Sequence, residues 1–355
     1  GGFGPEGYIL PGVMAYEVEF ENDPDVGAEL PAQEVFITDL LDDDLDLSTV
    51  EFTSFAFNNR VWQVPPGLSH YDTALDLRPE GIDLLVTVEM DVDPDSRMLS
   101  VTFRSLDPIT NQLPDDPDAG FLPVNTAAHD GEGFFTYLVS PASTVTGTVI
   151  TNQADIVFDV NESILTPITT HTFDAGSPTS SPGALAASQL QPTFDVSWTG
   201  SDDAGGSGIG SYDVYVSDDG GPWSLWQDDT PASSATFSGQ TGHTYAFYSV
   251  ATDNVGHVEG KSPSAEATTY VNVPPAVGAL LDTSDPVARP GLLALEAQGV
   301  SDADGTPVLV EFYDDANDND LLEPGVDTLI GTDTNGADGW SISVNTTGWT
   351  LGQHT

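Results

Sequence analysis

The sequence contains no cysteine and only six Lys and Arg residues, against 57 Asp and Glu residues in a chain of 355. Without cysteine, no disulfide framework can form. The net charge of −51 argues against nucleic acid and anionic membranes as partners, because both are negatively charged and are bound through basic surfaces. The sequence also lacks an apolar run approaching the roughly 18 residues that a membrane-spanning helix needs.

The residue types that are abundant favour a folded, all-β chain. Hydrophobic residues make up 39% of the sequence, with 16 Phe, 10 Tyr and 6 Trp, so cores can form despite the charge. The 35 Gly and 26 Pro mark many turns, and polar and apolar residues alternate as in half-buried strands. Bound divalent cations, a high-salt habitat and plain solubility all remain open as causes of the acidity. The start at Gly1, without Met, predicts a processed or excised piece.

The first expected domain, residues 1–173, opens with a Gly- and Pro-rich segment and continues as a series of strands. Residues 13–20 alternate, with Met14 and Tyr16 on one face and Glu17 and Glu19 on the other. Residues 84–90 and 99–105 are expected to pair as a hairpin. Further strands are expected at residues 34–39, 49–57, 134–139, 145–150 and 154–159.

Several separated motifs of this domain carry a family resemblance. They are MAYEVEFEN, VFITDLLDDDLDLSTVEF, SLDPITNQLPDDPDAGFLPVN and GTVITNQADIVFD. Over about residues 8–173 the chain resembles the conserved-repeat β-sandwich domains of large bacterial surface proteins. The resemblance implies an extracellular, non-catalytic stalk or matrix module. Some domains of this kind carry Lys–Asn isopeptide bonds, but the single lysine, Lys261, lies outside this region, so composition excludes that cross-link here.

Residues 174–190 are rich in Ser, Pro, Gly and Ala, which is typical of a linker. The second expected domain, residues 191–271, contains FDVSWTG, SGIGSYDVYVS and GHTYAFYSVATDNVG and resembles a fibronectin type III domain. The resemblance places Trp198 in the core. It places Tyr245 at the corner where that family's tyrosine hydroxyl bonds backbone. Ser249 departs from the pattern, because the family has an apolar residue there.

Residues 272–355 are expected to form a third, Ig-like sandwich that is incomplete. About six strands can be counted, fewer than the roughly seven of an Ig-type fold. The chain also ends at Thr355, where a closing hairpin is expected. Either the protein continues, or a neighbouring chain supplies the missing strand, because an open sheet edge is a liability in a soluble protein.

Within this third domain, residues 314–327 predict a calcium-binding loop. Alternating oxygen-bearing side chains in a non-helical loop can turn inward around calcium, which takes about six to eight oxygens. The loop resembles the first nine positions of an EF-hand loop, except that Asp320 replaces its Gly, and Val326 replaces its later bidentate Glu. A solvated acidic loop is the alternative. The predicted ligands are the side chains of Asp315, Asn317, Asn319, Glu323 and Asp327 and the carbonyl of Leu321.

Other acidic groups have weaker spacing signals. Asp302 and Asp304, in the segment DADG, are predicted to join a calcium site at a domain junction, or else to mark a turn. A solvated face or hairpin tip is the favoured interpretation of the acidic segments at 42–46, 91–95 and 115–118. A fourth acidic group is interpreted as solvated turn carboxylates at different ends of the second sandwich. Its members are Asp202, Asp203, Asp253 and Glu259.

Catalytic signals are few, so we predict that the protein is not an enzyme. The six His residues are scattered, and the sequence contains neither an HExxH zinc motif nor a GxSxG nucleophile motif. The segment GGSGIG at 205–210 mimics a phosphate-binding loop but lacks a Lys and a following helix. Pairs of carboxylates carry no weight for glycoside hydrolysis, because 57 acidic residues make chance pairs inevitable.

Together these features predict a non-catalytic extracellular structural protein, at the cell surface or secreted. Tandem β-sandwiches would form a rod that calcium stiffens, serving as an adhesin stalk, a surface layer or a filament subunit. Calcium is the predicted cofactor and partner, and a filament would add self-association by strand complementation. The alternative is an accessory region of a secreted hydrolase, built of fibronectin III-like, Ig-like or carbohydrate-binding modules. Trp223 and Trp226 would then be the residues that stack on a sugar.

Overall fold

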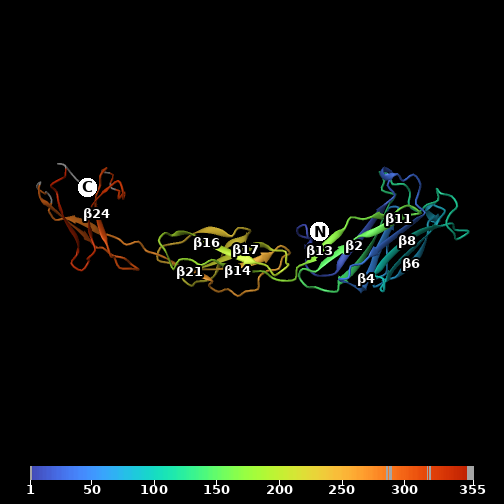
Figure 1. Cartoon of the computed structure of the whole chain (residues 1–355), viewed down its shortest axis with the longest axis horizontal. Coiled ribbons are helices and arrows are strands. Elements are labelled where there is room, and N and C mark those ends of the chain that lie inside the picture. Colours follow the sequence, from blue (N-terminus) through green and yellow to red (C-terminus); the bar gives the residue numbers. More distant parts are fainter. Residues whose placement is uncertain (1, 285–286, 288–289, 318, 320, 350–355) are drawn as a thin grey trace. The chain divides into compact units, whose positions relative to one another are not determined.

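The computed structural model describes residues 2–284, 287, 290–317, 319 and 321–349. Their regular secondary structure is almost entirely strand, which confirms the predicted all-β class of tandem sandwiches. Figure 1 labels the strands and colours them along the sequence. The chain divides into two compact units. The first consists of Gly1–Thr179, Gly200–Ser211 and Ala251–Gly260, and the second of Ser180–Thr199, Tyr212–Val250 and Lys261–Thr355.

Helical structure in the described residues is limited to two short 3-10 turns, η1 (Pro24–Val26) and η2 (Arg78–Glu80). Asp23 caps the first turn, because its side chain accepts a hydrogen bond from the amide of Asp25. Gly27 and Gly81 end the two turns in the left-handed conformation that glycine adopts without strain. Neither turn has the length or apolarity to cross a membrane.

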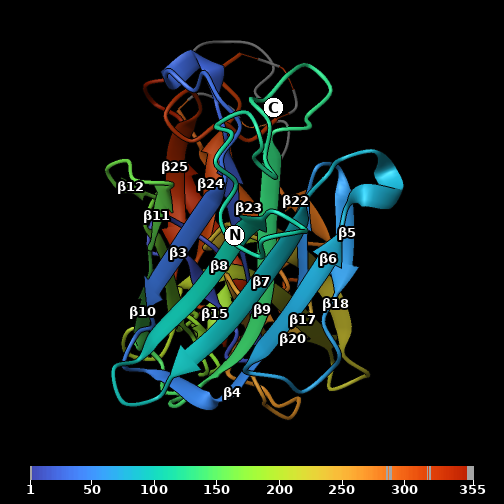
Figure 2. The ribbon, with the colours of Figure 1, turned by 90° about the vertical axis from the view of Figure 1, so that its right-hand side faces the viewer.

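Thirteen strands precede Asp174: β1 (Tyr8–Ile9), β2 (Met14–Glu21), β3 (Glu34–Leu40), β4 (Leu45–Phe57), β5 (Arg60–Gln63), β6 (Tyr71–Asp76), β7 (Leu85–Asp93), β8 (Met98–Leu106), β9 (Glu132–Pro141), β10 (Val149–Asn152), β11 (Ala154–Phe158), β12 (Ile164–Leu165) and β13 (Thr169–Phe173). The six-stranded sheet has the order β12-β11-β3-β8-β7-β6, and Figure 2 shows its last four strands side by side. The other sheets have the orders β2-β9-β4-β5 and β1-β13-β10.

The two larger sheets meet through alternate residues of their strands. In β2 every second side chain is buried and the others are exposed, as its period-two pattern predicts. Phe103 of β8 packs on Phe20 of β2 and Phe57 of β4, with ring centroids 5.2 and 6.1 Å apart. The predicted hairpin is confirmed, because β7 and β8 pair antiparallel with Val88 opposite Phe103. An aromatic-rich core therefore lies between the sheets.

Eight strands follow: β14 (Thr179–Pro182), β15 (Ser188–Gln189), β16 (Thr193–Ser201), β17 (Ile209–Asp218), β18 (Ser224–Thr230), β19 (Ser234–Ser238), β20 (Thr244–Asp253) and β21 (Ala267–Val271). Their sheets have the orders β14-β16-β19 and β15-β21-β20-β17-β18. The segment predicted as a linker, 174–190, thus contains β14 and β15. Sheet pairing uses backbone groups, so a segment with few apolar side chains can still add an edge strand.

Aromatic side chains form the core between these two sheets. Trp198 of β16 is fully buried, and its Nε1 donates to the carbonyl of Ala232 at 2.7 Å. The ring of Trp226 lies 6.0 Å from that of Trp198, and Trp223 packs edge-on against Tyr248. Both tryptophans suggested for sugar stacking therefore contact aromatic rings of the sandwich itself. The unexpected Ser249 is fully buried and lies 2.9 Å from the hydroxyl of Ser180.

The third group of strands is β22 (Ala279–Asp282), β23 (Leu292–Gln298), β24 (Val310–Asp314), β25 (Thr328–Asp333) and β26 (Trp340–Asn345). They form a sheet of order β22-β23-β26 and a two-stranded sheet of β24 and β25. The buried core that the described residues supply is small, consisting of Leu295, Ala297, Val310 and Phe312. The predicted open hairpin at Thr355 lies outside the described residues.

A buried carboxylate interrupts the apolar core of the first unit. Asp39 of β3 is 1% exposed, and its Oδ2 accepts a hydrogen bond of 3.1 Å from the Tyr137 hydroxyl. That hydroxyl accepts in turn from Asn152 Nδ2 at 2.9 Å. Burial raises the pKa of Asp39, and its hydrogen bonds with Asn152 and Tyr137 offset part of this shift. The folded state consequently favours the protonated form of Asp39 more than the unfolded state does.

We predict that Asp39→Asn removes a pH-dependent loss of stability. The pKa of Asp39 is higher in the folded state than in the unfolded state. Its favourable contribution to the free energy of unfolding is therefore fully present below its pKa in the unfolded state. That contribution is lost as pH rises through its pKa in the folded state. Wild type should therefore lose about 1.4 kcal/mol relative to the variant for each unit by which folding raises this pKa. Urea unfolding across that pH window measures the difference. A difference that does not change with pH would contradict the prediction, and Asp228→Asn, on an exposed position of β18, serves as the charge-matched control.

We also predict that Tyr245→Phe destabilises the protein by about 1–2 kcal/mol. The Tyr245 hydroxyl accepts a hydrogen bond of 2.9 Å from the backbone amide of Gln240, as the fibronectin III resemblance implies. Phenylalanine would leave that amide without its acceptor. Tyr215→Phe is the control, because the Tyr215 ring stacks on Tyr248 and would keep that contact. Equal unfolding midpoints for the two variants in urea would refute the role of the Tyr245 hydroxyl.

Candidate metal centres

The predicted calcium loop brings its carboxylates into contact with its backbone. Asp327, the residue directly before β25, is 7% exposed. Its two carboxylate oxygens accept from the amides of Ala316 at 3.3 Å and Glu323 at 2.6 Å. The amide of Asp327 donates back to the carbonyl of Glu323 at 2.9 Å. Asp327 therefore joins both ends of the loop.

Two of the remaining predicted ligands, Asn317 and Asn319, contact the Glu323 side chain. Its Oε2 accepts from Asn317 Nδ2 at 2.8 Å and from Asn319 Nδ2 at 2.7 Å. Asp315 accepts from the amide of Asn317 at 3.2 Å, and Asn319 Oδ1 accepts from the amide of Leu321 at 2.8 Å. The loop thus groups all five predicted side chains, whereas Asp320 lies outside the described residues. A cation here would require both asparagine amides to present oxygen in place of nitrogen.

Asp302 and Asp304 lie at a different set of contacts. Asp304 accepts from the amide of Val273 at 2.8 Å, just after β21 ends. A hydrogen bond from the Tyr270 hydroxyl is the largest cause that lowers the pKa of Asp304, and the bond from the Val273 amide is the second. The hydrogen bond to Asp304 raises the pKa of Tyr270 to about 12. The amide of Asp304 faces Asp302 Oδ1 at 3.4 Å. Asp304 thus anchors the segment after β21 through neutral donors, and its role as a calcium ligand stays a prediction.

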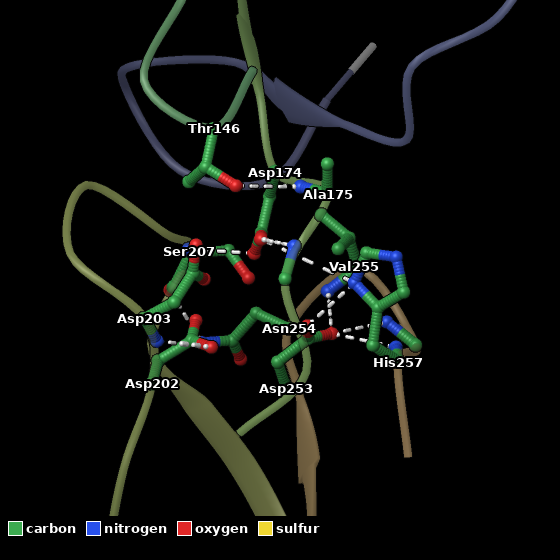
Figure 3. A network of polar contacts seen from close by, with 12 residues as sticks. Thr146, Asp174, Ala175, Asp202, Asp203, Ser207, Asp253, Asn254, Val255 and His257 are labelled. Carbon is green, nitrogen blue, oxygen red and sulfur yellow. Dashed lines mark hydrogen bonds and ion pairs between the residues drawn. The ribbon is translucent and has the colours of Figure 1, made fainter. Parts of the chain in front are cut away.

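A third group of acidic side chains lies within the first compact unit (Figure 3). Asp174 directly follows β13, Asp202 and Asp203 follow β16, and Asp253 is the last residue of β20. Ligand oxygens of Asp174, Asp202 and Asp203 lie within 4.8 Å of one another. A carboxylate oxygen of Asp174, one of Asp253 and a ring nitrogen of His257 form a second group within the same 4.8 Å limit. We call Asp174, Asp202, Asp203 and Asp253 the aspartate cluster.

Backbone amides hold three of these carboxylates in place. Asp174 Oδ2 accepts from the amide of Ser207 at 2.8 Å, and Asp202 Oδ2 accepts from that of Gly208 at 2.8 Å. Asp253 Oδ1 accepts three amide bonds from the turn that follows β20, and its Oδ2 lies 2.8 Å from His257 Nδ1. Local turn chemistry therefore aims carboxylates from separate segments at one place.

Charge in the aspartate cluster is poorly compensated. Burial raises the pKa of Asp202, the amides of Gly208 and Asp203 oppose this, and the charges of Asp174 and Asp253 raise it further. His257 Nδ1 lies 2.8 Å from Asp253 and 4.0 Å from Asp174. The described Lys and Arg side chains form their ion pairs elsewhere, with Glu80, Asp76, Asp43, Glu34 and Glu266. Such a group has the electrostatic character of a divalent-cation site.

The sequence interpretation of these residues was wrong in one respect. The loops after β16 and β20 were expected at different ends of the second sandwich, but Asn254 Nδ2 donates to the carbonyls of Ser207 and Gly208 at 2.8 and 3.0 Å. The two loops therefore meet. Sequence reasoning missed Asp174, Ser207 and His257 altogether. Glu259, which it grouped with them, accepts instead from the amide of Ala251 at 3.1 Å.

An exposed group completes the candidates among the described residues. His243 Nδ1 lies 2.8 Å from Asp218 and 3.2 Å from Asp219. The hydrogen bond to Asp218 raises the pKa of His243, and burial opposes this shift. Both aspartates are solvent-exposed. This group is adequately explained as a surface ion pair that forms when His243 is protonated.

Comparison with known proteins gives structural likenesses only. No protein-family model matches the chain, and no curated protein matches it. Among solved structures, the fibronectin(III)-like modules of Clostridium thermocellum CbhA are 18% identical, covering 43% of this chain and 73% of that one, with a TM-score of 0.23. Domains of the major pilin SpaD from Corynebacterium diphtheriae are 12% identical, covering 91% and 85%, with a TM-score of 0.25. These values are too low to assign a function to the chain.

Proposed function

We propose that this chain is a non-catalytic, extracellular structural protein whose tandem β-sandwiches are stiffened by calcium. Such a protein would serve as an adhesin stalk, a surface layer or a filament subunit. The observation that carries the proposal is the loop at 315–327, where the side chains of Asp315, Asn317, Asn319, Glu323 and Asp327 are linked to one another or to the loop backbone. An oxygen-rich loop of this kind suits calcium, which tolerates irregular geometry.

Calcium would act on the loop through electrostatics. Glu323 and Asp327 are both negatively charged, and the amide of Glu323 donates to Asp327, which holds the two residues together. A divalent cation between such groups replaces repulsion with attraction. Asn317 and Asn319 would supply amide oxygens after rotating, and the Leu321 carbonyl would add a neutral ligand. Because the third group of strands has a small buried core, an ion that closes the loop between β24 and β25 would contribute substantially to its stability.

We predict that calcium raises the thermal unfolding midpoint of the full chain and that EDTA lowers it. An ion present at about one hundred times its dissociation constant stabilises the folded form by about 2.7 kcal/mol. Asp327→Asn and Glu323→Gln should each remove the part of this gain that comes from the third group of strands. Differential scanning calorimetry measures the unfolding of the second compact unit, to which these strands belong.

The control for these variants is Asp228→Asn, which removes one exposed negative charge from β18. It should keep the full calcium response. An unfolding midpoint that is the same in EDTA and calcium, measured at low ionic strength, would count against calcium stiffening. A calcium response of the second compact unit that survives Glu323→Gln and Asp327→Asn would remove this loop from the proposal.

The filament version of this proposal adds strand complementation between chains. Within the described residues, β24 and β25 pair only with each other, so their outer edges are open to another strand. We expect the mass of the particle, measured by light scattering, to rise with protein concentration toward polymers. Substituting Pro for Glu311 in the middle of β24 should reduce this growth, because proline removes a backbone donor. A monomer at every concentration would rule out the filament version but not the stalk.

A further inference from the structure

We propose that the aspartate cluster, with the hydroxyl of Ser207, is a calcium site separate from the loop at 315–327. Asp174 is fully buried and Asp253 is 4% exposed, so these charges are largely removed from water. Ligand atoms of Asp174, Asp202 and Asp203 already lie within 4.8 Å of one another. Holding carboxylates this close without a counter-ion costs free energy, which a bound cation would recover.

Two buried oxygens in this place have no hydrogen-bond partner among the described residues. Ser207 is 8% exposed, and its hydroxyl makes no hydrogen bond, although its backbone amide donates to Asp174. The Oδ1 atom of Asp203 is likewise buried and unpaired. Figure 3 shows Ser207 among the aspartates. Buried polar atoms normally find a partner, and a cation would be that partner for both oxygens.

The backbone leaves room for these carboxylates at two glycines. A Cβ on Gly176 would lie 2.2–2.4 Å from the carboxylate atoms of Asp203. A Cβ on Gly206 would lie 2.6 Å from an oxygen of Asp202 and from one of Asp203. A side chain at either position would force Asp203, and at Gly206 also Asp202, to shift from its present place. Glycine at these positions therefore preserves the convergence of the oxygens.

The chemistry of the donors selects a hard cation. The cluster offers carboxylate oxygens and one hydroxyl oxygen, which suit calcium or magnesium better than zinc. His257 Nδ1, the nitrogen nearest the cluster, lies 2.8 Å from Asp253, so it orients that carboxylate and is not available as a ligand. Calcium is favoured over magnesium because the oxygens come from three separate segments, and calcium accepts irregular coordination.

An ion bound here would join segments that are far apart in the sequence. It would connect the residue after β13 with the loops at 200–211 and 251–260, all of which belong to the first compact unit. The same segments already share the bonds from Ser207 to Asp174 and from Asn254 to Ser207. Calcium would thus add to an existing backbone framework.

The test is calcium titration by calorimetry of the full chain, stripped with EDTA, in about 0.15 M KCl, which screens exposed charges over about 8 Å. The chain carries the changes Glu323→Gln and Asp327→Asn, so that the loop at 315–327 does not contribute. One calcium per chain should still bind. Adding Ser207→Ala should weaken this binding about tenfold, and adding Asp174→Asn should abolish it.

Ser207→Ala keeps the proposal falsifiable, because removing a hydroxyl that makes no hydrogen bond should not reduce the unfolding midpoint in EDTA. Asp228→Asn is again the charge-matched control, and it should leave binding unchanged. Calcium affinity that is the same with and without Ser207→Ala and Asp174→Asn would overturn the site. Binding of magnesium in preference to calcium would overturn the choice of ion. The changes in the loop at 315–327 are separate from those in the aspartate cluster. Loss of the cluster site would therefore leave the proposed function standing, and loss of the proposed function would leave the cluster site standing.

Discussion

Repulsion among carboxylates is the constraint under which this whole structure is built. With 57 acidic and six basic residues, most acidic groups cannot find a cationic partner within the chain. Many are satisfied instead by the amides of the turns in which they stand. Asp107 accepts from the amides of Ile109 and Thr110, and these bonds lower its pKa. Exposed turns thus accommodate negative charge with local hydrogen bonds and solvent.

Buried carboxylates require a different solution, and two of them contrast clearly. Asp39 is a single charge whose hydroxyl donor, Tyr137, comes from a strand of the facing sheet. Burial raises the pKa of Asp39, and a single added proton removes its charge. The aspartate cluster instead gathers several carboxylates around unpaired oxygens. A single proton cannot neutralise such a group, whereas a divalent cation carries enough charge to balance two carboxylates.

Much of the fold could be predicted from the sequence because its signals are local. The alternation in β2, the tight turn between β7 and β8, and the position of Trp198 and Tyr245 each depend on neighbouring residues. The loop at 315–327 could be proposed as a calcium site in the same way, because its candidate ligands lie within 13 consecutive residues. The strands β14 and β15 could not, since they are Ser-rich edge strands that pair through backbone atoms and carry no alternating apolar pattern.

The aspartate cluster was beyond sequence reasoning for a related reason. Its members come from residues 174, 202–203 and 253, and only the folded chain brings them together. Each segment by itself is an ordinary Asp- and Gly-rich turn. The decisive signals, a buried hydroxyl without a partner and two glycines that make room for carboxylates, are properties of three-dimensional packing.

The size of each core determines how much an ion can matter to each part of the chain. The first unit has an extensive aromatic core, which stabilises it without help from loops. Asp174 of the aspartate cluster directly follows the core residue Phe173, so an ion there would act mainly on the segments 200–211 and 251–260. The third group of strands has only four buried core residues among those described, and its predicted calcium loop joins β24, which carries Phe312, to β25. Under the two proposals, calcium would therefore act on the geometry of two segments in the first unit, and on the stability of the third group of strands.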